Sequence, residues 1–161
     1  MALGFKLFSI ICKIVILMNM TENIVTIPNI DVEAVVKSTV DAAYIVYSKL
    51  GPGLLESVYE QCLIYELRKK GLNLESQVSI PVCYEDMYME AGFRIDILIE
   101  KCLIIELKSV ESILPVHRAQ VLTYLRLSGK NLGLLINFNT ALFRDGVKRI
   151  INSKNIEIIQ K

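Results

Sequence analysis

Arg94-Ile-Asp-Ile-Leu-Ile-Glu-Lys-Cys-Leu-Ile-Ile-Glu-Leu-Lys108 is the segment around which we expect the chain to fold. Apolar residues alternate with other residues on both sides of a break in its middle, which is the period-2 pattern of β-strands. A three-residue loop centred on Lys101 joins these strands into a hairpin in which Ile99 faces Leu103. The other apolar residues that we expect on the same face are Ile95, Ile97, Ile105 and Leu107.

The charged residues of this hairpin form the first candidate site. Counting back from Ile99 places Asp96 opposite Glu106 and Arg94 opposite Lys108. Cβ atoms of directly opposite residues lie about 4.5–5.5 Å apart. Two facing carboxylates repel each other unless a positive charge lies between them, and a bound divalent cation commonly supplies that charge. Lys108 shares a strand face with Glu106, because the two are separated by one residue.

Length and charge limit the classes of function. The chain has 161 residues, which favours one domain, and its mean hydropathy of +0.44 is partly due to the first twenty residues. A net charge of +1 provides no global basic field, so nucleic-acid binding requires a local patch. The candidates for such a patch are Arg118, Arg126, Lys130, Lys148 and Arg149.

The cysteines favour a reducing compartment. Their number is 4, none forms a CxxC pair, and all lie in apolar surroundings. A disulfide framework or a zinc site is therefore not expected, and free thiols in a cytoplasmic protein are the better interpretation.

Residues 1–20 form an apolar leader that has three explanations. Its uninterrupted apolar part is shorter than the about 20 residues that a membrane span needs. With Lys6 it resembles a weak signal peptide, yet there is no small-residue cleavage site before Thr21. We favour the third explanation, a misassigned start with translation beginning at Met18 or Met20. Membrane attachment is not favoured.

The remainder, residues 31–161, is expected to form one α/β domain. Its elements follow the order α-α-β-β-β-α-β, a mixed sheet flanked by helices. Pro81 indicates an edge strand, because proline cannot donate to the ladder. The expected helices are Val32–Leu50, with Asp31 before it, then 54–70 and Pro115–Leu127. The expected strands are 73–90 with a turn near 85–86, the hairpin above, and 132–138. After them, 139–146 is expected as a loop, 147–152 as a short helix and 156–159 as a strand.

Asp96, Glu106 and Lys108 together have the chemistry of phosphodiester hydrolysis. Mg²⁺ takes oxygen ligands and commonly binds one or two protein carboxylates. A neighbouring lysine can orient the attacking water and balance phosphate charge. The competing explanation is paired ions on a solvated strand face. Ile104 and Ile105 argue against it, because they place Glu106 in a hydrophobic strand on a face that is expected to be partly covered, where a charge needs a partner or a metal.

Several ordered motifs resemble a known nuclease family. Asp96, followed by Glu106-x-Lys108, resembles the core of the PD-(D/E)XK nucleases, and residues 53–59 (GLLESVY) resemble the motif that names the GxxExxY branch of that superfamily. Gln120-x-x-x-Tyr124 is similar to a motif of bacterial recombination exonucleases. The proline that precedes the core Asp in the family is Ile95 here, and the cysteine cluster of the iron–sulfur relatives is missing.

The resemblance implies a restriction-endonuclease-like fold and assigns the catalytic roles. Asp96 and Glu106 would bind Mg²⁺, for which Mn²⁺ can substitute, together with the backbone carbonyl of Leu107. Glu56 would join this metal site directly or through water, and Lys108 would orient the nucleophilic water.

The resemblance also implies supporting roles. Gln120 and Tyr124 would position the site or contact phosphate, and Tyr59 is expected to anchor the helix that carries Glu56. For His117, substrate contact and a packing or capping role stay open. For Arg94, phosphate contact and neutralisation of Asp96 stay open.

Two functions from different classes follow from this sequence. The favoured one is a Mg²⁺-dependent nuclease of the cytoplasm that acts on nucleic acid, with DNA favoured over RNA. The alternative is a catalytically silent nucleic-acid-binding or protein-interaction module that keeps the fold. No separate target-recognition segment is evident in the sequence. We therefore expect loops, a homodimer or a partner protein to supply specificity.

Overall fold

The computed structural model describes residues 30–85 and 87–153. The leader at residues 1–20 and the strand expected at 156–159 lie outside the described residues.

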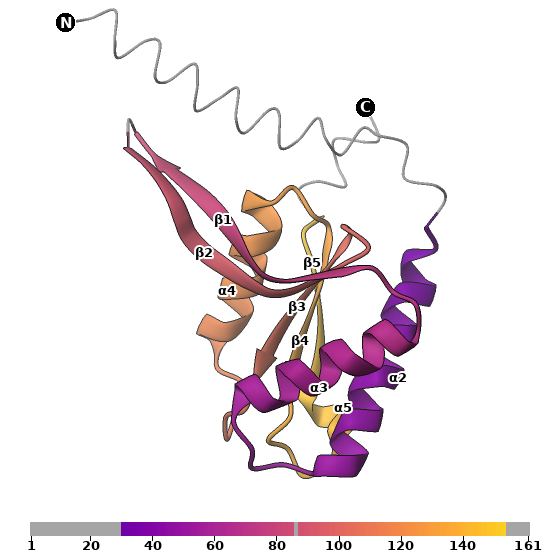
Figure 1. Cartoon of the computed structure of the whole chain (residues 1–161). Coiled ribbons are helices and arrows are strands. Elements are labelled where there is room, and N and C mark those ends of the chain that lie inside the picture. Colours follow the sequence, from indigo (N-terminus) through magenta and orange to yellow (C-terminus); the bar gives the residue numbers. More distant parts are fainter. Residues whose placement is uncertain (1–29, 86, 154–161) are drawn as a thin grey trace, which may run out of the picture.

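One mixed sheet carries the fold. Among the described residues it has five strands in the order β1-β2-β3-β4-β5, and β3–β4 is the one parallel pair of these strands (Figure 1). β3 is therefore the central strand, which explains why it is buried along almost its whole length. The strands are β1 (Leu74–Tyr84), β2 (Met87–Ile99), β3 (Leu103–Lys108), β4 (Leu132–Asn137) and β5 (Val147–Ile151).

The helix boundaries follow capping signals in the sequence. The Asp31 carboxylate accepts hydrogen bonds from the N–H groups of Glu33 and Ala34 at the start of the first helix. Gly51 ends that helix with a φ of 67°, a conformation that glycine adopts without strain. The helices are α2 (Val32–Leu50), α3 (Glu56–Lys69), α4 (Pro115–Leu127) and the short α5 (Phe143–Gly146).

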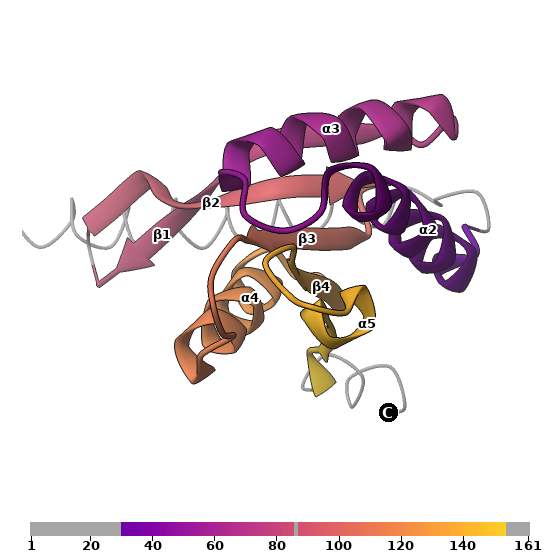
Figure 2. The same cartoon turned by 90° about the horizontal axis from the view of Figure 1, so that it is seen from below.

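The helices cover both faces of the sheet. α2, α3 and α5 pack on one face around a core that includes Leu63, Ile105 and Phe138, whereas α4 packs on the other face around Ile104 and Leu125. Figure 2 shows the sheet between these two groups of helices. The predicted α/β fold with a mixed sheet flanked by helices is confirmed.

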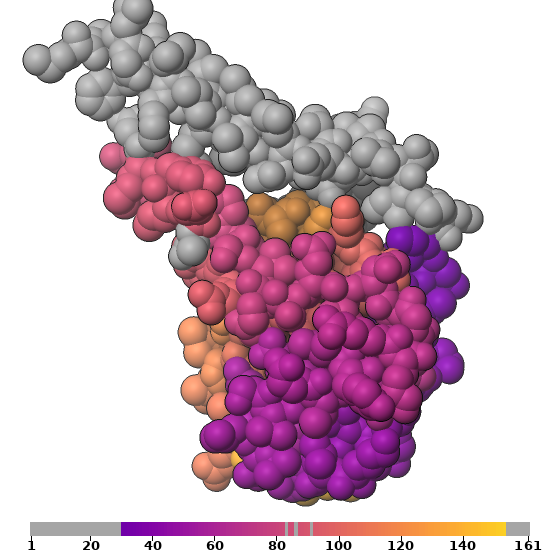
Figure 3. Space-filling view, in the orientation of Figure 1, coloured from indigo at the N-terminus to yellow at the C-terminus, as the bar shows by residue number. Residues whose placement is uncertain are grey.

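The β1–β2 hairpin turns over part-way along its length. Ile97 packs in the core under α2 and α3, but Ile95 packs in the core under α4. The expectation that Ile95 shares a face with Ile97 and Ile99 is therefore wrong, whereas Ile97 and Ile99 do lie in the same core. Gln77 stands opposite Asp96 at the turning point with a φ of 56°, which costs a non-glycine residue on the order of 1–2 kcal/mol. Beyond this point the hairpin stands out from the body (Figures 1 and 3).

Two other sequence predictions need correction. The segment expected as a short helix at 147–152 is strand β5, which pairs antiparallel with β4. The loop expected at 139–146 contains α5. The edge position predicted from Pro81 is confirmed, because β1 is an edge strand. No helix among the described residues is long and apolar enough to cross a membrane.

Tyr59 ties α3 to the loop that precedes it. Its side chain is fully buried and stacks on Phe138 with ring centroids 4.4 Å apart. Its hydroxyl donates to the carbonyl of Gly51 at 2.6 Å and accepts from the N–H of Leu54 at 3.1 Å. The loop therefore closes over Tyr59, and this fixes where α3 begins.

Replacement of Tyr59 by Phe should lower the free energy of unfolding by about 1–2 kcal/mol, because Gly51 and Leu54 lose their hydrogen-bond partner while the ring stacking is kept. Tyr65→Phe is the matched control, since that ring lies on the same helix and is 62% exposed. Urea unfolding followed by circular dichroism measures both variants. Equal stabilities for the two would contradict the role given to the Tyr59 hydroxyl.

Candidate active site

The predicted site residues come from four elements, with Asp96 on β2 and the others on β3, α3 and α4. Lys108 is the last residue of β3, Glu56 is the first residue of α3, and α4 starts at Pro115, shortly after the end of β3. Figures 1 and 2 show the tip of β3 beside the beginnings of α3 and α4. The starts of α3 and α4 therefore lie near the C-terminal end of β3, where Lys108 is the last residue.

Glu106 is a buried carboxylate with only half of its oxygens satisfied. Its residue is 2% exposed on the central strand. Lys108 Nζ donates to Oε1 at 2.5 Å, as their shared strand face predicts. The second oxygen, Oε2, is buried and has no hydrogen-bond partner in the described part of the chain. An unsatisfied buried carboxylate oxygen is costly, so it marks a position where a ligand would be stabilised.

The surroundings of Glu106 favour its protonated form. Burial raises the pKa of this carboxyl to about 7, and the negative charge of Asp96 adds to the effect. The hydrogen bond from Lys108 opposes both influences without cancelling them. At neutral pH this group is therefore divided between its two protonation states, which is unusual for a glutamate.

Asp96 lies beside Glu106 but is held by the main chain. The β2–β3 ladder runs from Ile99–Leu103, as predicted, to Ile97–Ile105. One step further, Asp96 Oδ2 accepts the N–H of Leu107 at 2.8 Å. The Asp96 side chain of β2 thus bonds the main chain of β3 beyond Ile97–Ile105, the last residue pair of the β2–β3 ladder. Burial raises the pKa of Asp96, while the Leu107 hydrogen bond and the Lys108 charge lower it.

Lys108 stays cationic in this setting. Burial disfavours its ammonium, but the hydrogen bond to Glu106 and the charges of Glu106, Glu56 and Asp96 together raise its pKa. Its side chain is 13% exposed, so the ammonium is partly accessible from outside. The site therefore presents a fixed positive charge between acidic groups.

Glu56 and Tyr124 border this group from two helices. Glu56 is half-buried at the start of α3, and its charge acts on Asp96, Glu106 and Lys108. Gln120 Nε2 donates to the Tyr124 hydroxyl at 2.6 Å, which joins the two residues of the predicted motif. Burial raises the pKa of Tyr124, and so do the charges of Glu106 and Asp96. Tyr124 therefore faces the acidic pair from α4.

The other predicted residues have structural contacts. His117 Nδ1 accepts the N–H of Leu114 at 3.2 Å, so this ring caps the start of α4. Arg94 is exposed and pairs with Ser79 of β1, at a level of β2 that the ladder to β3 does not reach. Tyr59 holds the loop before Glu56, in agreement with the anchoring role expected for it.

Asn137 is a positioning residue that the sequence did not reveal. It is 1% exposed at the end of β4, where the sequence shows only a run of apolar residues. Its side chain donates to the Val110 carbonyl at 2.7 Å and accepts the Val110 N–H at 3.0 Å. The chain that leaves the site after Lys108 is held in this way. Asparagine at the end of a buried strand was the available signal.

The donor set fits a divalent cation in its chemistry. Glu106 Oε2 is an orphaned buried oxygen, and Asp96 supplies a second carboxylate beside it. Carboxylate and carbonyl oxygens are the ligands that Mg²⁺ takes. Among the described residues, no group of three His, Cys, Asp or Glu side chains stands close enough to hold a metal ion by itself. A cation here would therefore be bound by the two carboxylates of Asp96 and Glu106 together with other oxygen donors, and not by three or more acidic side chains.

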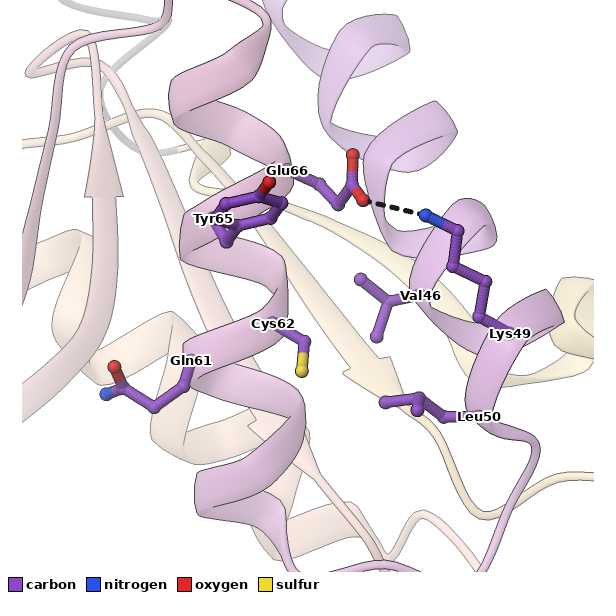
Figure 4. Close-up of a pocket in the computed structure, with 7 residues that line it drawn as sticks. All are labelled: Val46, Lys49, Leu50, Gln61, Cys62, Tyr65 and Glu66. Atoms are coloured by element: carbon purple, nitrogen blue, oxygen red, sulfur yellow. Dashed lines mark hydrogen bonds and ion pairs between the residues drawn. The ribbon is translucent and has the colours of Figure 1, made fainter.

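One cavity lies away from the acidic site. It has a volume of about 250 Å³ and lies between α2 and α3 (Figure 4). The Lys49–Glu66 ion pair, with Nζ and Oε1 3.0 Å apart, lies at its border. Its lining residues are Val46, Lys49, Leu50, Gln61, Cys62, Tyr65 and Glu66. None of the predicted catalytic residues lines this cavity, so it is separate from the acidic site.

Comparison with known proteins places this arrangement in a family. No curated protein and no solved structure matches the chain closely enough to be counted as similar. The family model described as the PD-(D/E)XK nuclease superfamily matches residues 33–150, which includes α3, the β2–β3 hairpin and α4. This chain therefore belongs to the PD-(D/E)XK nuclease superfamily.

Proposed function

We propose that this protein is a Mg²⁺-dependent nuclease that hydrolyses phosphodiester bonds of nucleic acid at the site around Glu106. The observation that carries this proposal is the buried Glu106 carboxylate, with one oxygen on Lys108 and the other without a partner in the described chain. A structural ion pair would satisfy both oxygens. The superfamily of the chain supports nuclease chemistry of this kind.

The residues of the site have distinct roles in this proposal. Asp96 and Glu106 would hold the cation with the carbonyl of Leu107, and Glu56 would join this site through a water molecule, because no three acidic side chains of the described residues stand close enough to bind one ion. Such a cation, when bound, lowers the pKa of a coordinated water and neutralises phosphate charge. Lys108 supplies a fixed positive charge that orients the attacking water and stabilises the negative charge of the phosphate. The pair of Gln120 and Tyr124 supports the site from α4 and contacts the phosphate.

The proposed reaction is the hydrolysis of one ester bond. The oxygen of a water forms a bond to phosphorus, and the bond from phosphorus to one ester oxygen breaks. The attacking water gives up one proton and the departing oxygen takes one, so the products are a phosphate monoester and a hydroxyl. In this proposal Lys108, Asp96 and Glu106 balance these charges, and the hydrogen bonds that join them to each other and to β3 support such a role.

Several finer parts belong to the same proposal. We infer that DNA is the preferred substrate, that Mn²⁺ replaces Mg²⁺, and that the protein acts in the cytoplasm. Residues 53–59 support membership of the GxxExxY branch, because Gly53, Glu56 and Tyr59 lie in the order that names it. Specificity would come from a homodimer or a partner protein.

Asp96→Asn and Lys108→Met should each reduce cleavage by about 10²-fold or more, because each removes a charge that acts on the reacting groups. The exposed residues Asp145 and Lys37 provide matched controls, and Asp145→Asn and Lys37→Met should cleave as the wild type does. The assay incubates each protein with linear, circular and single-stranded DNA and with RNA, with Mg²⁺ or Mn²⁺.

Cleavage that persists in both site variants would overturn the catalytic assignment. A wild-type protein that binds nucleic acid without metal and cleaves none of the four substrates would favour the alternative, a silent binding module that has kept the fold.

Mg²⁺ or Mn²⁺ should raise the thermal unfolding temperature of the wild type by a few degrees, because a cation that binds only the folded state stabilises it. Glu106→Gln should remove most of this increase. Glu66→Gln is the matched control, since Glu66 is also a buried carboxylate but bonds Lys49 and Lys69 on the far side of α3. Differential scanning fluorimetry measures the change. Equal metal responses in these two variants would exclude Glu106 as a ligand.

The stability of the metal-free protein should depend on pH through Glu106. Its pKa rises from 4.5 to about 7 on folding, so the folded state binds the proton more tightly than the unfolded state does. Its contribution to the free energy of unfolding is therefore complete below pH 4.5 and is lost as the pH rises through about 7. The loss is up to about 3 kcal/mol.

Glu106→Gln removes this dependence, because an amide does not titrate. Urea unfolding in EDTA across that pH range should give a steeper fall in stability for the wild type than for the variant. The groups that face Glu106, namely Asp96, Glu56 and Lys108, are present in both proteins. Parallel curves would show that the proton is not held more tightly on folding.

A further inference from the structure

The β1–β2 ladder is interrupted at the level of the site. Ser76 pairs with Ile97 and Val78 pairs with Ile95, and between these pairs Gln77 stands opposite Asp96. This is the point where the hairpin turns from one core to the other. Because strand residues normally alternate between faces, a turn at this level changes where the side chain of Asp96 is directed.

Gln77 holds a left-handed backbone conformation at this interruption. Its φ is 56°, a value that persists in a non-glycine residue only where the surroundings fix it. Its Nε2 donates to Oε1 of Glu60 at 2.7 Å, a contact that joins the edge strand to α3. Gln77 is thus fixed from outside the sheet.

Glu60 lies one helical turn after Glu56 on α3. It is half-buried, and its negative charge acts on Asp96. The same helix therefore carries one carboxylate of the proposed site and, one turn further, the carboxylate that holds the opposing strand. The exposed Glu60–Gln77 hydrogen bond therefore joins α3 to the hairpin at the level where Asp96 accepts the N–H of Leu107.

We propose that Glu60 and Gln77 are a positioning pair, which holds the turned segment of the β1–β2 hairpin so that Asp96 stays bonded to the main chain of β3. This inference rests on the proposed function for its catalytic meaning, but its geometry concerns the metal-free chain. Neither residue touches substrate, and both act through Asp96.

Amide hydrogen exchange of Leu107 tests the pair directly in the metal-free protein. Asp96 accepts this N–H, so a loosened Asp96 exposes it. Glu60→Ala, Gln77→Ala and Gln77→Gly should each speed exchange at Leu107 about five- to tenfold, while Leu103, within the paired ladder, stays protected. Glu60→Gln should keep the wild-type rate, because its amide oxygen still accepts from Gln77. Gln61→Ala, an exposed neighbour on α3, is the matched control.

Unchanged exchange at Leu107 in Glu60→Ala and Gln77→Ala would overturn the proposal. A wild-type rate in Gln77→Gly alone would also overturn it, because glycine keeps the backbone conformation without the contact to Glu60. Mn²⁺ titration by calorimetry is the second readout, in which the three loosened variants should bind about tenfold more weakly and Glu60→Gln should match the wild type.

A wild type that cleaves no nucleic acid would defeat the proposed function, yet the exchange result would still decide on the positioning pair. The two failures are therefore distinguishable.

Discussion

The burial of one carboxylate in the central strand is the constraint on which the site depends. Glu106 is 2% exposed because β3 has a strand on each side and helices on both faces. A charge in such a place is costly unless it is paired, and Lys108 satisfies only one of its oxygens. Replacing a buried ion pair by apolar residues is often neutral or stabilising, so the stability of the fold does not explain this pair. Its chemistry does.

Local patterns were sufficient to predict most of the fold. The bounds of α2 and α4 agree with the sequence because each helix has its own stop and start signals, such as Asp31 and Pro115. The pairing of Ile99 with Leu103 follows from the length of the loop between them. The hydrogen bond between Glu106 and Lys108 follows from strand periodicity, because residues two apart lie on the same face of a strand. These features depend on neighbours in the sequence, and so a sequence pattern contains them.

The remaining features depend on contacts between distant segments. The turn of the hairpin at Gln77 is stabilised by a residue of α3, so period-2 alternation wrongly kept Ile95 and Ile97 on one face. Strand β5 was mistaken for a helix because its five residues gain their pairing from β4. Asn137 gave no signal beyond its place at the end of an apolar run, since its partner Val110 lies on another segment.

The geometry of the site therefore depends on contacts from other segments as much as on β3 itself. Asp96 and Glu106 repel each other, and each lies in surroundings that raise its pKa. Left to themselves, two such carboxylates would separate toward water. They stay together because Asp96 is bonded to the N–H of Leu107, and because Tyr59 and Asn137 hold the loops on either side. A scaffold that keeps like charges together in the metal-free state has already met part of the free-energy cost of organising the proposed cation site, and such preorganisation would strengthen binding of the cation.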